Sequence, residues 1–180
     1  MVWQEQVTNI FMLCNLVEDR VAKCAQYYPA ATPVSFGPFT LTPQLSTTLS
    51  PGLLQRTFTL SQGSASRTIT WVHYQSWPDH GVPTNYEDLT RLLAEIDKCA
   101  PTSPILVHCS AGVGRTGTVI ALSILQDLVR KTRDLREAPA ISIFSVVRRM
   151  REQRLSMVQT PDQYVLLYAF MAQWLSTLTS

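Results

Sequence analysis

The pattern of apolar and polar positions divides this chain into a first half that favours strands and a second half that favours helices. The opening residues predict a truncated helix start, followed by a short apolar strand at Ile10–Cys14. Phe39–Thr42 alternates with a period of two, as a strand does. Leu45–Leu54 lacks a clear period, and its Pro, Ser and Thr residues predict a loosely structured stretch.

A hairpin and a loop close the first half. The runs Arg56–Leu60 and Arg67–Tyr74 contain Thr and aromatic residues and flank a polar stretch with Gly63, which favours a β-hairpin. In Trp77–Pro83, two prolines and a glycine exclude regular structure. We therefore expect the chain to leave the hairpin as an irregular loop.

Apolar residues of the second half recur mainly with the helical period. The run Ile105–His108 instead predicts a buried strand, and the Gly-rich segment after it leads into a helix that continues through Val129. The last helix starts at Thr160, which forms a capping box with Gln163 around an N1 proline. The residues expected to face the core from the other helices are Leu89, Leu92, Leu93, Ile96, Ile143, Val146, Val147 and Met150.

The order of these elements indicates the fold class. Thr84 and Glu87 form a further capping box, which predicts the start of the first long helix. Strands precede helices more than they alternate with them, and the sequence contains no internal repeats. We expect one domain over residues 1–180 with an α/β, or α+β-like, architecture in which helices flank a mixed sheet.

Composition narrows the function classes. The 180 residues are 46% hydrophobic and 16% charged, which is a globular balance. A net charge of +2 without a dense Lys/Arg stripe argues against a nucleic-acid partner. No apolar run reaches the roughly 18 residues that a membrane span needs. Glu5 stands where a signal peptide requires basic residues, so secretion is not expected.

The four cysteines do not form a metal-type pair or a dense disulfide framework. This usage predicts reduced thiols in an intracellular compartment and no bound metal. Cys14, Cys24 and Cys99 are interpreted as ordinary core cysteines, because nothing around them suggests chemistry. Cys109 is different, because glycines and an arginine come after it at a predicted strand-to-helix turn.

The segment from Pro104 to Gly117 carries the predicted chemistry. A strand ends at His108, small residues turn the chain, and a helix begins after them, so backbone N–H groups and the helix dipole favour a bound phosphoryl group. The same N–H groups stabilise a Cys109 thiolate, which is a strong nucleophile. Arg115 is placed to grip two phosphate oxygens at once, and Thr116 is placed to donate its hydroxyl to the sulfur.

A second interpretation of this loop is a dinucleotide site. Gly112-Val-Gly114-Arg-Thr-Gly117 also matches G-x-G-x-x-G, and Glu137 lies 20 residues after Gly117. However, no clear second strand ends at Glu137, and a cysteine and an arginine in the loop have no purpose in that fold. The phosphate-transfer interpretation is therefore preferred.

Residues 108–117 resemble the His-Cys-x5-Arg-Ser/Thr-Gly signature of phosphotyrosine-specific protein tyrosine phosphatases. The loop Trp77–Pro83 resembles the mobile acid loop of that family, and Gln159–Tyr164 resembles its glutamine loop. The opening Met1–Glu5 is similar to a helix with a Trp-Glu pair, and Asn15–Tyr27 is similar to the glutamate-bearing loop. The match spans nearly the whole chain. It implies a highly twisted mixed sheet flanked by helices.

The resemblance also implies roles for single residues. Asp79 would be the general acid and then the base, and Gln159 would position the hydrolytic water with help from Gln163. Glu18 would hold Arg115, Lys23 would orient the closed acid loop, and Trp77 would act near its hinge. His108 would support the low thiol pKa. The phosphoryl group would lie against Ser110, Ala111, Gly112, Val113, Gly114, Arg115, Asp79, Gln159 and Gln163. No cofactor is implied, because loop amides and Arg115 neutralise the transferring group.

The same resemblance leaves two functional hypotheses. Family domains carry about a hundred residues before the Trp-Glu helix, including the tyrosine loop that sets pocket depth, so this chain is expected to be an N-terminally truncated domain. It is either a hydrolase of phosphotyrosine-containing proteins or a binding and regulatory protein that is impaired in turnover. Both hypotheses are compatible with flanking domains in a longer parent protein. Both are also compatible with a cytoplasmic location, either as a cytoplasmic protein or as the intracellular part of a membrane receptor. Behind the loop, Arg151 and Arg154 match a supporting stretch.

Overall fold

The computed structural model describes residues 1–78, 81–134 and 141–178 of the 180. Asp79, which carries the predicted acid role, and Glu137 lie outside the described residues. The chain forms, in order, β1 Asn9–Met12, β2 Val17–Glu18, β3 Val21–Ala22, β4 Val34–Phe36, β5 Phe39–Ser50, β6 Leu53–Gln62, β7 Ala65–Tyr74, α1 Glu87–Asp97, β8 Ile105–His108, α2 Gly114–Asp134, α3 Ile143–Gln153 and α4 Pro161–Leu178.

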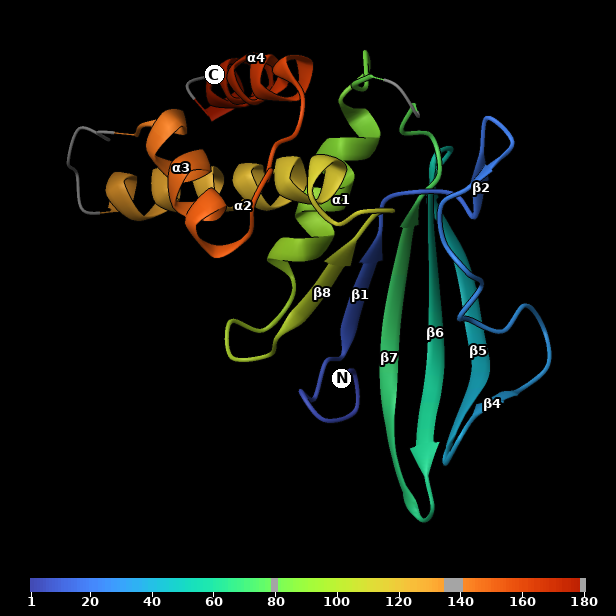
Figure 1. The fold of residues 1–180 in the computed structure, drawn as a ribbon. Helices are drawn as coiled ribbons and strands as arrows, with labels where there is room; N and C mark the ends of the chain where they lie inside the picture. Colours follow the sequence, from blue (N-terminus) through green and yellow to red (C-terminus); the bar gives the residue numbers. More distant parts are fainter. Residues whose placement is uncertain (79–80, 135–140, 179–180) are drawn as a thin grey trace.

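A mixed sheet forms the centre of the molecule. Its strand order among the described residues is β4-β5-β6-β7-β1-β8. The pairs β4–β5, β5–β6 and β6–β7 are antiparallel, whereas β1 is parallel to both β7 and β8. The carboxyl ends of β1, β7 and β8 therefore meet at one edge of the sheet (Figure 1). The expected mixed sheet with flanking helices is confirmed.

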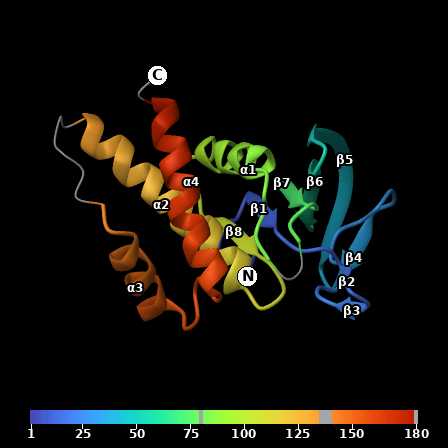
Figure 2. The same cartoon turned by 90° about the horizontal axis from the view of Figure 1, so that it is seen from above.

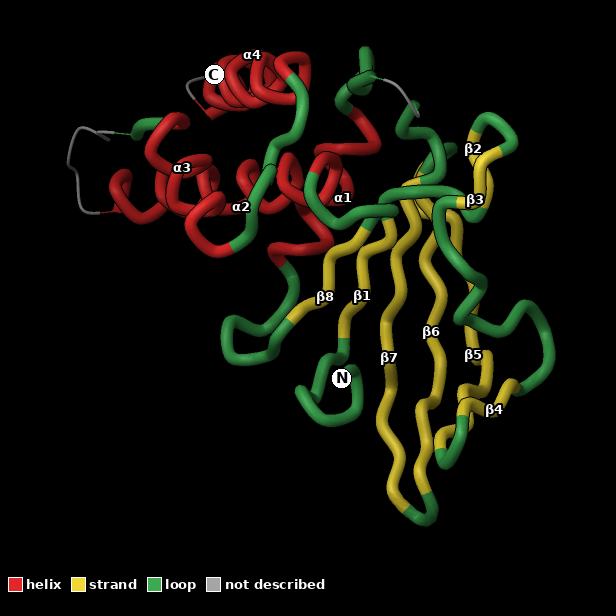
Figure 3. The backbone as a smooth tube through the Cα atoms, viewed as in Figure 1, coloured by secondary structure: helices red, strands yellow, loops and turns green. Residues whose placement is uncertain are grey.

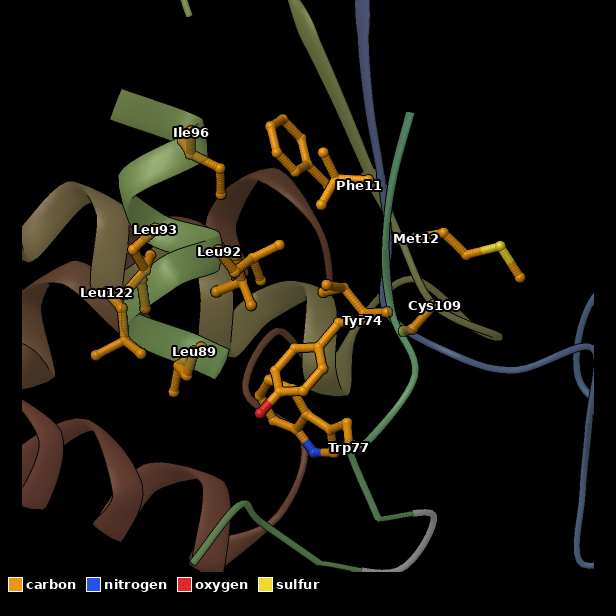
Figure 4. Close-up of a cluster of buried hydrophobic side chains, with 14 of the residues drawn as sticks. Phe11, Met12, Tyr74, Trp77, Leu89, Leu92, Leu93, Ile96, Cys109 and Leu122 are labelled. Carbon is orange, nitrogen blue, oxygen red and sulfur yellow. The ribbon is translucent and has the colours of Figure 1, made fainter. Parts of the chain in front are cut away.

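The helices lie together on one side of the sheet, with α2 between α1, α3 and α4 (Figure 2). Figure 4 shows Leu92 and Ile96 of α1 on the side that faces Phe11 and Tyr74 of the sheet, and Leu93 beside Leu122 of α2. The four predicted core residues of α1 are buried, and so are the four predicted core residues of α3. Both amphipathic patterns are thus confirmed, because one apolar stripe of each helix packs into the core.

The antiparallel part of the sheet extends well beyond the parallel part (Figure 3). The predicted hairpin around Gly63 is present as β6 and β7. The prediction of a loosely structured stretch at Leu45–Leu54 is wrong. The strand β5 runs to Ser50 and pairs with β6 across two register irregularities. Pairing with β6 makes this segment a strand, although its own uncharged, Ser/Thr-rich sequence shows no strand pattern.

Three expected helix boundaries also differ. The helix α1 begins at Glu87 after Tyr86 rather than after a Thr84 cap, and Glu87 N–H instead donates to the side-chain oxygen of Asn85 at 2.9 Å. The helix α2 continues past Val129 to Asp134. The opening residues form a single turn with a bond from Glu5 N–H to Met1 O. By contrast, the Thr160–Gln163 capping box is present in both directions.

Candidate active site

The loop that carries the predicted nucleophile lies where β8 passes into α2, at the edge where the parallel strands end. The strand stops at His108, Cys109 comes directly after it, and α2 begins at Gly114. A Cβ added to Gly117 would lie 2.4 Å from the backbone nitrogen of Val158. The first turn of α2 therefore contacts the segment before α4 closely, and Val158 N–H donates to Val113 O at 3.0 Å.

Hydrogen-bond donors converge on the sulfur of Cys109. The Thr116 hydroxyl donates to Cys109 Sγ at 3.1 Å, and the backbone N–H groups of Gly112, Val113 and Thr116 bond to the same sulfur. Burial by itself raises the pKa of this thiol, but the four donors outweigh it, so the pKa lies below its ordinary value of 9.0. A buried cysteine is thus poised to ionise.

Arg115 is held by contacts from three separate segments. Its Nη1 donates to Glu18 Oε1 at 2.6 Å and to Leu13 O at 3.0 Å, and its Nη2 donates to Glu18 Oε2 at 2.9 Å. Nη2 also donates to Pro78 O at 3.2 Å. Both partners of the ion pair are buried. A two-point ion pair fixes the plane of the guanidinium, and the Pro78 bond ties it to the predicted acid loop.

A cavity of about 560 Å³ opens over this loop. It brings together residues from four segments of the chain that the sequence separates widely. The lining contains the predicted residues Glu18, Lys23, Cys109, Ser110, Ala111, Gly114, Arg115, Gln159 and Gln163, together with Cys14, Gly81, Thr160 and Asp162. The structure therefore gathers most of the predicted site residues that it describes around one hollow.

The two predicted glutamines lie over the loop. A Cβ on Gly114 would stand 3.0 Å from Gln163 Nε2 and 3.1 Å from Gln159 Oε1. Gln163 Oε1 also accepts the backbone N–H of Gln159 at 2.9 Å and that of Thr160 at 3.3 Å. Gln163 is thus both a helix cap and a wall of the cavity, and it fixes the backbone of Gln159.

Several predicted residues do not line the cavity. Gly112, Val113 and Thr116 contact the sulfur through the bonds given above, and Trp77 is buried, with its Nε1 donating to Gly81 O at 3.3 Å. His108 bonds instead to Tyr27 and to the carbonyl of Cys109. Burial lowers its pKa below the ordinary value, and the bond to Cys109 O opposes this.

Two arginines support the loop from outside. Arg154 Nη2 donates to Ala111 O at 3.1 Å. Arg151 donates to Met157 O at 2.9 Å and to Val158 O at 2.7 Å, and so holds the segment that contacts Val113. Val158 has φ of 59°, which is strained for a β-branched residue. These bonds fix an otherwise unfavourable backbone.

Sequence reasoning assigned no role to three residues near the loop: Cys14, which lines the cavity, Tyr27, which bonds to His108, and Trp71, which bonds to Tyr27. Cys14 and Trp71 have ordinary sequence neighbours, so no local signal marks them, whereas Tyr27 ends the stretch that resembles the glutamate-bearing loop without a role of its own. Among the described residues, no group of His, Cys, Asp and Glu is arranged to hold a metal ion, and no helix is long and apolar enough to cross a membrane.

Comparisons with known proteins show what nearly the whole chain is similar to. The family model described as protein-tyrosine phosphatase matches residues 1–173. Tyrosine-protein phosphatase 2 of Dictyostelium discoideum is 33% identical over 180 residues, which cover 98% of this chain and 48% of that protein. Tyrosine-protein phosphatase non-receptor type 18 of Mus musculus is 36% identical, and the match covers 98% of this chain and 39% of the mouse protein.

Solved structures give the same result. The catalytic domain of human protein tyrosine phosphatase non-receptor type 18 superposes with a TM-score of 0.89 at 32% identity, covering 96% of this chain and 62% of that domain. The same phosphatase in complex with HER2-pY1248 phospho-peptides gives a TM-score of 0.86 at 32% identity, covering 96% of this chain and 64% of the other. This chain spans less than half the length of the two curated relatives.

Proposed function

The chain belongs to the protein-tyrosine phosphatase family, and from this premise we propose that it hydrolyses phosphotyrosine in proteins through a phosphocysteine intermediate. The observation that carries the proposal is the sulfur of Cys109, which receives four hydrogen bonds inside the cavity that Arg115 lines. A related phosphatase binds HER2 phospho-peptides, which supports phosphotyrosine-containing proteins as the substrate class. Residues 1–180 would act as one catalytic unit.

In the first step, the Cys109 thiolate attacks phosphorus while the bond from phosphorus to the phenolic oxygen breaks. Asp79 protonates the departing phenolate, so tyrosine leaves as the neutral phenol. Arg115, oriented by Glu18, grips two phosphoryl oxygens together with the amides of Ser110 to Gly114. To do so, its Nη groups exchange the carbonyls of Leu13 and Pro78 for phosphate.

In the second step, water attacks phosphorus and the sulfur–phosphorus bond breaks, which releases inorganic phosphate. Gln159 positions the water, Gln163 fixes Gln159, and Asp79 accepts the proton. The Thr116 hydroxyl stabilises the thiolate that leaves. Lys23, on the cavity wall, orients the acid loop, and Trp77 anchors the hinge of that loop through Gly81.

The test is phosphate release from an aryl phosphate by the purified chain. Wild type is expected to turn over, Cys109→Ser to lose at least about 10⁴-fold in kcat, and Asp79→Ala to lose kcat while substrate still binds. Turnover that survives Cys109→Ser would refute the covalent route. Binding of phosphotyrosine peptide without turnover in wild type would instead support the regulatory alternative.

A further inference from the structure

Three segments of the chain meet at the carboxylate of Asp88, in the first turn of α1. Ser76 comes directly before the predicted acid loop, and its hydroxyl donates to Asp88 Oδ2 at 2.7 Å. Ser50 is the last residue of β5, and its hydroxyl donates to Asp88 Oδ1. The acid loop leads from β7 into α1, so Ser76 and Asp88 stand on either side of it (Figure 1). One carboxylate therefore connects the two ends of this loop to each other and to the sheet.

The turn between β5 and β6 fits closely against this carboxylate. A Cβ added to Gly52 would overlap with both Ser76 Oγ and Asp88 Oδ2, so any larger residue would displace them. The carbonyl of Gly52 also accepts the backbone N–H of Gln75 at 2.8 Å. The carbonyl of Gln75 accepts the side-chain amide of Asn15 at 3.1 Å. The backbone before the acid loop is thus held from two directions, by the turn and by the segment after β1.

A carboxylate suits this position for two reasons. The first turn of a helix favours negative charge, because the positive end of the helix dipole lies there. The two oxygens of Asp88 each accept a different hydroxyl, and bonds to a charged acceptor are the stronger kind. The amide of an asparagine has a single oxygen, and its NH₂ group only donates, so it could accept just one of the two hydroxyls.

The beginning of the acid loop is packed as well as hydrogen-bonded. Trp77 is buried, and its ring centroid lies 5.5 Å from that of Tyr74 on β7 (Figure 4). A segment whose two ends are fixed has fewer conformations than one with a free end. The bonds of Asp88 thus restrict the arrangements of the acid loop, although Asp88 is not among the residues that line the cavity over Cys109.

This inference rests on the proposed function for the acid role of Asp79. A proton donor must lie within hydrogen-bond reach of the leaving oxygen, so a small displacement of the donor slows the reaction. We propose that Asp88 is a positioning residue that fixes both ends of the acid loop and thereby the reach of Asp79 toward the leaving oxygen. Loss of the Asp88 bonds should therefore slow the protonation of the leaving group and leave phosphate binding intact.

The first test compares two leaving groups. Phosphotyrosine releases tyrosine, whose phenolic oxygen must be protonated, whereas the nitrophenolate of para-nitrophenyl phosphate is a stable anion that leaves without a proton. Asp88→Asn should lower kcat/KM about tenfold for phosphotyrosine but less than about threefold for para-nitrophenyl phosphate. Ser76→Ala should lower it about threefold for phosphotyrosine, and Ser76→Thr, which keeps the hydroxyl, should restore it. Equal losses for the two substrates would overturn the proposal.

Glu87→Gln is the matched control. Glu87 is the neighbouring acid in the same turn of α1, it is exposed, and it is not the acceptor of either serine hydroxyl. Its removal changes the charge at the helix start by the same amount, so kcat/KM should stay unchanged for both substrates. In the Asp88→Asn background, Ser76→Ala should add little, because the bond that it removes is already weakened. Losses that add fully would contradict a shared role of these two residues.

The second test does not need turnover. Hydrogen exchange, read by mass spectrometry in the intact chain, reports on the backbone amides of residues 77–86. Asp88→Asn and Ser76→Ala should each speed exchange in this peptide about threefold or more and leave α4 unchanged. Ser76 is exposed, so Ser76→Ala keeps the test valid if Asp88→Asn fails to fold. Unchanged exchange in the folded variants would refute the role of Asp88. Faster exchange in a chain whose wild type has no turnover would refute the proposed function but not the fixing of the loop.

Discussion

Two thiols at the ends of neighbouring parallel strands have opposite properties. Cys14 lies just beyond β1 and Cys109 just beyond β8, the two strands are paired, and both cysteines are buried and line the same cavity. Yet the pKa of Cys109 lies below 9.0, whereas that of Cys14 is raised to about 12. Both cysteines are buried and both follow the end of a parallel strand, so these two features are not enough to lower the pKa of a thiol.

The two strands differ in the path that the chain takes beyond each cysteine. After β8 the chain turns through the loop into α2, so backbone N–H groups and the Thr116 hydroxyl reach the sulfur of Cys109. After β1 the chain leads to β2, and the pKa of Cys14 is raised first by burial and then by the negative charge of Cys24, Cys109 and Glu18. A thiol at this edge of the sheet becomes reactive only where backbone N–H groups of the following loop donate hydrogen bonds to its sulfur.

The largest expected effect is selective alkylation. At pH 7, a thiol with a pKa of about 12 is ionised to only about one part in 10⁵, so iodoacetamide should label Cys109 at least about 1,000-fold faster than Cys14. Mass spectrometry of peptides from a time course measures both rates in one sample. Inorganic phosphate should protect Cys109 alone. Equal labelling rates for the two thiols would contradict the difference in pKa between Cys14 and Cys109.

Gly117→Ala should remove hydrogen-bond donors from the sulfur of Cys109, and so make this thiol more like Cys14 at the end of β1. The new Cβ would lie 2.4 Å from the backbone nitrogen of Val158, so α2 must shift and withdraw its donors from the sulfur. We expect a loss of about 2 kcal/mol in the free energy of unfolding, measured in urea, and slower alkylation of Cys109. Gly63→Ala at the hairpin tip, where nothing lies within 4 Å, is the control and should leave alkylation unchanged. Native alkylation in folded Gly117→Ala would contradict the role of this contact.

Thr116→Val removes a single donor from the sulfur. Because a hydrogen bond to a charged group is worth about 1.5 kcal/mol, the alkylation rate of Cys109 at pH 6 should fall roughly tenfold, and the difference should vanish at high pH. Thr118→Val, which removes an equally buried hydroxyl that donates to Gly114 O, is the matched control. If both variants slow alkylation equally, the loss of the Thr116 hydrogen bond to the sulfur is not the cause.

Cys14→Ser should have the smallest effect at neutral pH, and it tests the thiol whose pKa is raised. Its folded pKa is raised, so its contribution to stability is complete below pH 9.0 and is lost as pH rises toward 12. Between these values wild type should lose up to about 1.4 kcal/mol per pH unit relative to the variant. Urea unfolding at pH 9, 10 and 11 measures this difference, and kcat should change less than about threefold. Parallel stability curves would show that Cys14 does not titrate in this way.

The sequence predicted the parts of the fold that are coded locally. The strand Ile105–His108, the α3 core positions and the Thr160–Gln163 cap were correct, because a few consecutive residues determine each of them. The stretch Leu45–Leu54 was missed, because β5 owes its length to pairing with β6 and not to its own pattern. The start of α1 was placed too early for a similar reason, since Asn85 supplied the contact assigned to Thr84.

The candidate site divides in the same way. The sequence alone determined that Cys109, the glycines, Arg115 and Thr116 share one strand-to-helix turn, because they lie within nine consecutive residues. Only the tertiary structure decided which side chains meet that turn: Glu18 comes to Arg115 from 97 positions away, and Tyr27 comes to His108 from 81. Such contacts arise where parallel strands end together, and strand order is a property of the whole sheet that no local pattern encodes.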